Sequence, residues 1–238
     1  MADLSRISYL QKGKGKDLVF FHGYLASKES FAAQIGYFSR YCRVTAIDFP
    51  GFGGAQPLTE PFSVSDYAEW TREALTALGL SRPHVIAHSF GCRVAVKMAS
   101  ADGEIFDKLL LTGPAGIILR RGAKYRLQVG TYRLVRKIAP KFADRHFGSE
   151  EYRSLSPVMR ESYKKIVNED LREDARKIGN EVLLVEGRED KTTPPEAAEI
   201  YRSCLRHGRM KTMEGGHFAF VEYPVAFNLI AEEFFFHG

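Results

Sequence analysis

The 238-residue sequence lacks long hydrophobic runs and has only three cysteines. No stretch approaches the ~20 consecutive apolar residues of a transmembrane helix, so we expect no membrane span. Charged residues interrupt the short apolar stretches of residues 1–10, and we expect no secretory signal peptide there. Cys42, Cys92 and Cys204 lie far apart and are odd in number, which argues against a disulfide framework. We therefore expect a cytoplasmic protein.

Histidine and cysteine clusters with metal-ligand spacing are also missing, so we expect neither a metal nor another cofactor. The formal net charge is +5, and residues 119–178 alone hold 16 Lys/Arg against 8 Asp/Glu. This surplus is typical of a solvated helical surface, and it would also attract anionic substrates. No nucleic-acid-binding motif accompanies the charge, so no nucleic-acid partner is expected. The sequence leaves the oligomeric state open, with a homodimer as one alternative.

What the sequence does contain is an alternation of strand-like and helix-like segments. Such an order predicts an α/β fold, with a mostly parallel sheet flanked by helices. The predicted strands are 7–10, 18–21, 43–47, 85–87, 108–111, 182–185 and 209–213. Further helices are predicted over 30–39, 66–78 and 224–235, and another follows residue 89.

The alternation breaks between residues 114 and 179, where helical runs dominate and no strand is convincing. This segment lies between two predicted strands, as an insertion would. We predict a core formed by residues 1–113 and 180–238, with residues 114–179 inserted as an all-helical cap. The cap would lie above the carboxyl edge of the sheet.

A serine marks the junction of a predicted strand and the helix that follows it. Small residues, Ala87 and Gly91, flank Ser89 two positions away on each side. A sharp turn between strand and helix needs such small neighbours and pushes its central residue toward positive φ. The pattern predicts an exposed nucleophilic hydroxyl at the tip of the turn.

A serine nucleophile needs a base and an orienting carboxylate, which we expect on loops at the same sheet edge. Asp190 follows the strand at 182–185 and precedes a helix that begins near Pro194. Its neighbour Glu189 is the alternative carboxylate. The predicted base is His217, which follows the last strand in a glycine-containing loop.

The same edge should carry the groups that bind substrate. The backbone N–H of Phe90, at a helix N-terminus, is the first predicted oxyanion donor. The N–H of Tyr24, in the loop after the first buried strand, is the second, with that of Leu25 as the alternative. Candidate substrate-binding residues are Leu25, Ile117, Leu119, Tyr125 and Tyr132.

Taken together, these motifs resemble the α/β-hydrolase family. The matching pieces span almost the whole chain, and Ala87 replaces the family's usual glycine. They are Phe21-His22-Gly23, Asp48-Phe49-Pro50-Gly51-Phe52-Gly53, Ala87-His88-Ser89-Phe90-Gly91, Gly187-x-x-Asp190 and Gly216-His217-Phe218. The resemblance implies a Ser89, Asp190 and His217 triad, a helical cap, and a structural rather than catalytic Asp48.

A serine at the turn disfavours the family's carboxylate-dependent dehalogenases and epoxide hydrolases. The resemblance favours hydrolysis of small-molecule carboxylic esters, with small to medium, fairly apolar acyl or alcohol groups, through an acyl-enzyme. The same three residues would also serve C–C bond hydrolysis of meta-cleavage-type dienoic keto acids. A non-catalytic binding protein of this fold is the third alternative.

Overall fold

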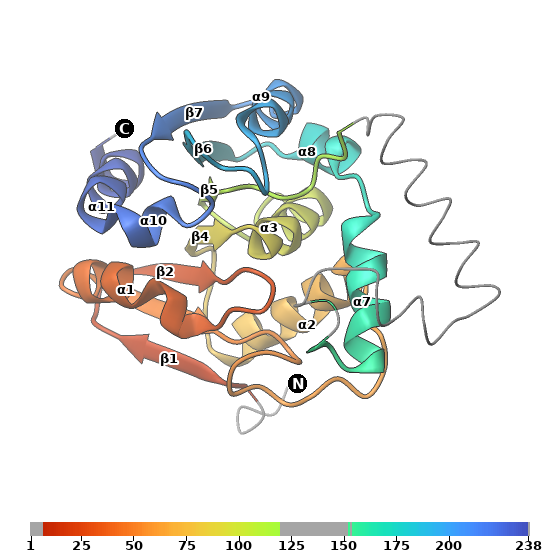
Figure 1. Cartoon of the computed structure of the whole chain (residues 1–238). Coiled ribbons are helices and arrows are strands. Elements are labelled where there is room, and N and C mark those ends of the chain that lie inside the picture. Colours follow the sequence, from red (N-terminus) through yellow and green to blue (C-terminus); the bar gives the residue numbers. More distant parts are fainter. Residues whose placement is uncertain (1–6, 120–151, 153, 238) are drawn as a thin grey trace.

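One seven-stranded sheet organises the chain, for which the computed structural model describes residues 7–119, 152 and 154–237. The strand order is β1-β3-β2-β4-β5-β6-β7; β1 is antiparallel to β3 and every other neighbouring pair is parallel (Figure 1). The strands are β1 Tyr9–Lys12, β2 Lys16–Phe21, β3 Cys42–Ile47, β4 His84–His88, β5 Lys108–Thr112, β6 Glu181–Gly187 and β7 Gly208–Met213. The predicted mostly parallel sheet is confirmed.

Helices cover both faces of this sheet (Figure 1). Helices α1 and α11 pack on one face through one apolar cluster, and α2, α3, α8 and α9 share the cluster on the other. The helices are η2 Lys28–Phe31, α1 Ala32–Phe38, α2 Val64–Ala77, α3 Phe90–Ala101, α7 Pro157–Val167, α8 Arg172–Lys177, α9 Pro195–Cys204, α10 Ala219–Glu222, α11 Pro224–Glu232 and η3 Glu233–His237. The predicted helix at 66–78 begins two residues earlier, because Ser63 caps it through a capping box with Asp66.

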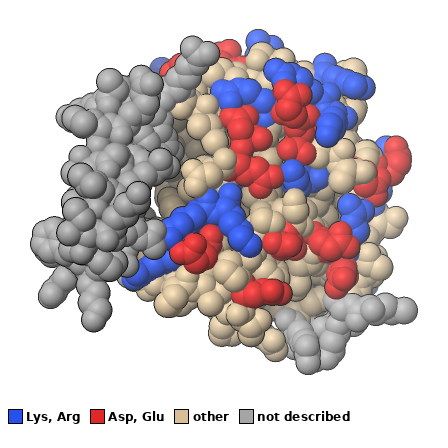
Figure 2. Space-filling view, turned by 90° about the vertical axis from the view of Figure 1, so that its right-hand side faces the viewer, with Lys and Arg blue, Asp and Glu red and all other residues tan. Residues whose placement is uncertain are grey.

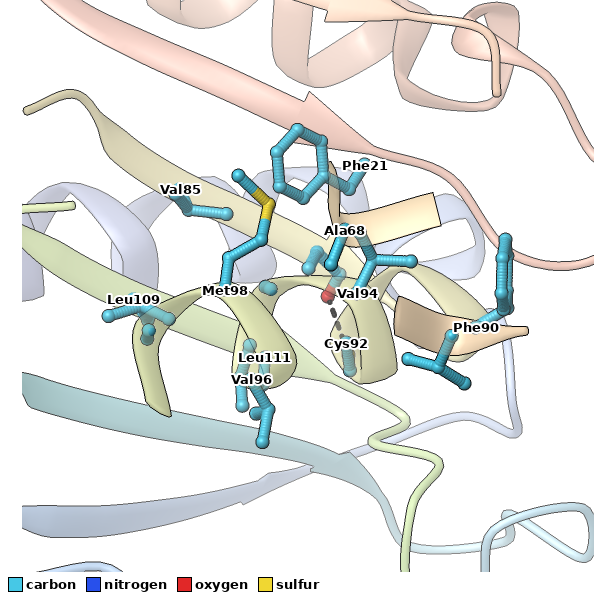
Figure 3. Packing of buried hydrophobic residues seen from close by; sticks show 14 of the residues in the cluster. Phe21, Ala68, Val85, Phe90, Cys92, Val94, Val96, Met98, Leu109 and Leu111 are labelled. Carbon is cyan, nitrogen blue, oxygen red and sulfur yellow. Dashed lines mark hydrogen bonds between the residues drawn. The ribbon is translucent and has the colours of Figure 1, made fainter. Parts of the chain in front are cut away.

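The two apolar clusters follow from the period-two alternation of a strand buried on both faces. In β2, Leu18 and Phe20 face one cluster, whereas Val19 and Phe21 face the other. All four side chains are fully buried. Figure 3 shows the second cluster, where α3 packs against β2, β4 and β5. This packing fixes the N-terminus of α3 at the carboxyl edge of the sheet.

The segment between β5 and β6 contains α7 and α8 in its described part. Residue 152 and residues 154–178 hold six Lys/Arg and five Asp/Glu, so the basic surplus of the sequence lies mainly outside the described residues. Figure 2, which views the right-hand side of Figure 1, shows basic and acidic side chains interleaved on this face of the molecule. Lys97 of α3, for example, pairs with Glu169 and Asp174.

Within the described ranges, no helix has the length and apolar character needed to cross a bilayer. The same ranges contain no group of three or more His, Cys, Asp or Glu side chains arranged to hold a metal ion. All three cysteines are buried and free. Burial raises the pKa of the Cys42 thiol to about 11, so this group is a neutral thiol at pH 7.

Candidate active site

Ser89 sits on a strained turn between β4 and α3. Its φ of 49° and ψ of −107° place a non-glycine residue in a region that L-amino acids rarely adopt. Gly91 makes the turn possible, because a Cβ there would lie 2.3 Å from the carbonyl oxygen of Phe21. The sequence predicted this backbone from the small residues around the serine.

His217 connects Ser89 to Asp190. Its Nε2 lies 3.0 Å from Ser89 Oγ, and its Nδ1 lies 2.7 Å from Asp190 Oδ2. The loop that carries His217 closely approaches the end of β6: a Cβ on Gly187 would lie 2.1 Å from the carbonyl oxygen of Gly216. The structure therefore brings together the three side chains that the sequence predicted, from three separate loops. Glu189, the alternative carboxylate, is exposed.

Asp190 is held as a carboxylate by a ring of donors. Its Oδ1 accepts N–H bonds from Thr192 at 2.7 Å and Thr193 at 2.9 Å, and its Oδ2 accepts the Thr193 hydroxyl at 2.8 Å. Burial alone would raise the pKa of Asp190, but the bonds from His217 and Thr193 outweigh it and lower the pKa to about 2. Asp190 is thus ionised at neutral pH and can orient His217 and stabilise its protonated form.

Thr193 contacts both Asp190 and His217, which the sequence analysis did not predict. Its Oγ1 lies 2.8 Å from Asp190 Oδ2 and 3.2 Å from His217 Nδ1. We expect Thr193→Val to lower kcat/KM for an ester by ~10-fold, equivalent to the ~1.5 kcal/mol of one hydrogen bond to a charged group. Steady-state kinetics checks this. Thr193→Ser should retain activity, and equal losses in both variants would contradict the role of the hydroxyl.

A second carboxyl group, Glu186, is buried at the end of β6. Its side chain is inaccessible, and neither of its oxygens has a hydrogen-bond partner among the described residues. Burial, reinforced by the nearby charge of Asp190, raises the pKa of Glu186 to about 9. Glu186 is therefore neutral at pH 7. The sequence signal for it was an acidic residue directly after the apolar run of residues 182–185.

Glu186 should make stability depend on pH. Because its folded pKa of about 9 exceeds the ordinary 4.5, the folded state binds an extra proton between these values, and stability falls as pH rises through that window. Glu186→Gln removes the titration. We expect its free energy of unfolding, relative to wild type, to increase from pH 5 to pH 8 by on the order of 3 kcal/mol. Urea unfolding at both pH values measures this, and parallel pH profiles would contradict it.

Ser89 and His217 open onto a cavity of about 710 Å³. The described part of its wall is mostly apolar. It includes residues 114–119, which follow β5, and α7, which contributes Tyr163 and Ile166. Of the predicted substrate-binding residues, Leu25, Ile117 and Leu119 line the cavity. Tyr125 and Tyr132 lie outside the described residues.

The two predicted oxyanion donors flank Ser89. Tyr24 and Phe90 both line the cavity, and their rings meet edge to face with centroids 5.6 Å apart. Phe90 opens α3, and the first N–H groups of a helix have no acceptor within the helix. Leu25, the alternative to Tyr24, has a φ of 59°. The backbone N–H groups of these residues can donate hydrogen bonds to an oxygen that becomes negatively charged beside Ser89.

His22 fixes the loop that carries Tyr24. Its Nδ1 lies 2.7 Å from the carbonyl oxygen of Gly23, and its Nε2 lies 3.1 Å from the amide nitrogen of Phe49. These partners require one ring nitrogen to donate and the other to accept, as only neutral imidazole does. Burial lowers the pKa of His22 to about 4, which keeps the ring neutral at pH 7.

His88 supports the opposite side of the site. Its Nε2 lies 2.9 Å from the carbonyl oxygen of His217, and its ring packs against Phe218 and Phe220. Burial lowers the pKa of His88 to about 3, so it is neutral at pH 7. This contact of His88 with the backbone of His217 was not predicted from the sequence.

A serine, a histidine and a carboxylate joined at the carboxyl edge of a parallel sheet define a hydrolase-type site. The model of the alpha/beta hydrolase family matches residues 18–228. The chain belongs to this family.

The curated relatives that the chain matches carry different names. The chain is 25% identical to 2-hydroxymuconate semialdehyde hydrolase from Pseudomonas putida, over 96% of this chain and 90% of that protein. Three other curated matches are partial and cover between 26% and 38% of the relative's length. A pimeloyl-[acyl-carrier protein] methyl ester esterase from Nitrosomonas europaea is 23% identical over 90% of this chain and 94% of that protein.

Among solved structures, an esterase from Exiguobacterium antarcticum is similar with a TM-score of 0.77 at 20% identity, over 96% of this chain and 94% of that chain. A meta-cleavage product hydrolase from Pseudomonas fluorescens IP01 is similar with a TM-score of 0.75 at 21% identity, over 96% and 93%. At these identities the likeness shows the fold alone.

Proposed function

We propose that the protein is a serine hydrolase that cleaves carboxylic esters with small to medium, fairly apolar acyl or alcohol groups. The observation that supports this proposal most is the chain of contacts from Ser89 to Asp190 beside a mostly apolar cavity. His217 Nε2 lies 3.0 Å from Ser89 Oγ, and His217 Nδ1 lies 2.7 Å from Asp190 Oδ2. An activated serine next to an apolar pocket suits acyl transfer.

In the proposed mechanism, Ser89 Oγ attacks the ester carbonyl carbon while His217 Nε2 accepts the hydroxyl proton. The N–H groups of Tyr24 and Phe90 stabilise the oxyanion. Collapse of the tetrahedral intermediate breaks the bond to the alcohol, which takes the proton from His217, and an acyl-enzyme remains. Water, deprotonated by His217, then releases the acid, and Asp190 stabilises the imidazolium in both steps.

We further propose that residues 114–179 form a cap over this site, inserted into a core of residues 1–113 and 180–238. The wall that α7 contributes to the cavity supports this division. The hydroxyl of Tyr24 in the core donates to the carbonyl oxygen of Met159 in α7 at 3.0 Å, which ties the two parts together at the cavity.

A second candidate is hydrolysis of a C–C bond in a meta-cleavage-type dienoic keto acid, which the similarity to 2-hydroxymuconate semialdehyde hydrolase over most of both chains favours. A substrate panel tests the choice. We expect hydrolysis of short p-nitrophenyl esters and none of a meta-cleavage product. The reverse result would support the C–C hydrolase, and inactivity on both, with no labelling by a fluorophosphonate, would support a binding protein.

A further inference from the structure

Arg93 is a buried cation in the wall of the cavity. Its residue is 7% exposed, and it is the one Lys, Arg, Asp or Glu among the described residues that line the cavity. Among the described residues, its hydrogen bond runs from Nη1 to the carbonyl oxygen of Glu169 at 2.7 Å. A charge in such a place is costly unless a partner compensates it.

No carboxylate in the described part of the chain forms an ion pair with Arg93. The two acids whose charges act on it are engaged elsewhere. Glu169 pairs with Lys97 at 2.8 Å, and Asp170 pairs with Arg172 and accepts the N–H of Ile118. Donor capacity of the guanidinium thus remains beyond the bond to Glu169, and Arg93 is part of the cavity wall.

The position of Arg93 relative to Ser89 follows from helix geometry. Arg93 lies in the first turn of α3, four residues after the N-cap Ser89, so their Cα atoms are ~6 Å apart, and both residues line the cavity. Helical side chains lean toward the helix N-terminus, which here is the end that carries Ser89. A short substrate chain would therefore suffice to link a group bound to the guanidinium with the reacting carbonyl.

We propose that Arg93 binds a carboxylate of the substrate, so that the preferred esters carry an apolar chain ending in a carboxylate. A planar guanidinium can hold a carboxylate with two parallel hydrogen bonds, which gives both affinity and orientation. The inference rests on the proposed function and adds the charge of the substrate to it.

The test compares esters of similar length that differ in charge. The first pair is p-nitrophenyl hemiglutarate and p-nitrophenyl valerate, with the anion on the acyl side; the second is 4-acetoxybutanoate and butyl acetate, with the anion on the alcohol side. We expect one pair to show higher kcat/KM for the anion in the wild type. In Arg93→Gln this preference should fall by ~10- to 100-fold, the loss expected for a charged hydrogen-bonded pair.

Three variants separate recognition from structure. Arg93→Gln can still donate to the Glu169 carbonyl, and Arg93→Lys keeps the charge and should retain part of the preference. Lys211→Gln removes an exposed cation of β7, outside the described cavity wall, and should leave the preference unchanged. An unchanged preference in both Arg93 variants, or no preference for the anion in either wild-type pair, would overturn the proposal.

Binding distinguishes this proposal from the proposed function. Titration calorimetry with glutarate on Ser89→Ala, and on the same protein carrying Arg93→Gln, needs no chemistry. A glutarate affinity that is weaker by ~10-fold or more in the double variant supports anion binding by Arg93. This holds even if the wild type hydrolyses no ester, because a lack of ester hydrolysis would remove only the proposed function. Ser89-dependent ester hydrolysis with equal glutarate binding in both proteins would remove only the role of Arg93.

Discussion

Ser89→Ala is expected to lower kcat for p-nitrophenyl ester hydrolysis by about 10⁴- to 10⁶-fold, the range found when a triad serine is removed from other hydrolases. The substitution deletes the oxygen that lies 3.0 Å from His217 Nε2. Alanine keeps the Cβ of serine, so the strain at φ 49° is the same in both proteins. Stopped-flow and steady-state assays of purified wild type and variant measure the loss.

The oxyanion donors are backbone groups and remain in Ser89→Ala, so a small residual rate above water is expected. Circular dichroism and thermal unfolding provide the control that the fold is unchanged. A variant that is folded and retains more than about a tenth of the wild-type rate would exclude Ser89 as the nucleophile, since removal of an activated serine lowers the rate far more than this.

Asp190→Asn should lower kcat by ~10⁴-fold, the effect of the same change in a serine-protease triad. The amide keeps the size of the carboxylate but loses the charge that stabilises protonated His217. It also favours the wrong imidazole tautomer, because an N–H can replace the acceptor 2.7 Å from His217 Nδ1. The loss should appear in kcat more than in KM, because Asp190 acts through His217 and not on substrate.

The neighbouring residue offers a matched control for this prediction. Glu189 is exposed, and the structure places Asp190, not Glu189, against His217. Glu189→Gln removes the same charge one position away and should leave kcat within about twofold of wild type, as for most surface substitutions. A large loss in Glu189→Gln with little loss in Asp190→Asn would reverse the assignment.

The sequence could predict the frame of the site because each part has a local signature. Small residues around Ser89 predicted the turn. An apolar strand followed by a Gly-containing loop predicted the positions of Asp190 and His217. The parallel order of the strands then put the three loops at one edge. None of these inferences needed knowledge of contacts across the sheet.

The supporting groups could not be predicted in the same way because they depend on such contacts. Burial makes Glu186 a neutral acid, and its depth is set by neighbouring strands and helices. Arg93 follows Ser89 by four residues, so its place in the first turn of the helix was predictable, but the absence of an ion pair among the described residues was not. The two tyrosines predicted as cavity lining, Tyr125 and Tyr132, stay predictions.

Covalent trapping tests the central claim most directly. Reaction with a fluorophosphonate, followed by intact-protein and peptide mass spectrometry, should show one phosphonyl group, attached to Ser89. His217→Ala should slow this reaction strongly, because the serine would lose its base. A stoichiometric adduct on another residue, or labelling of Ser89 at an unchanged rate without the His217 imidazole, would contradict the account.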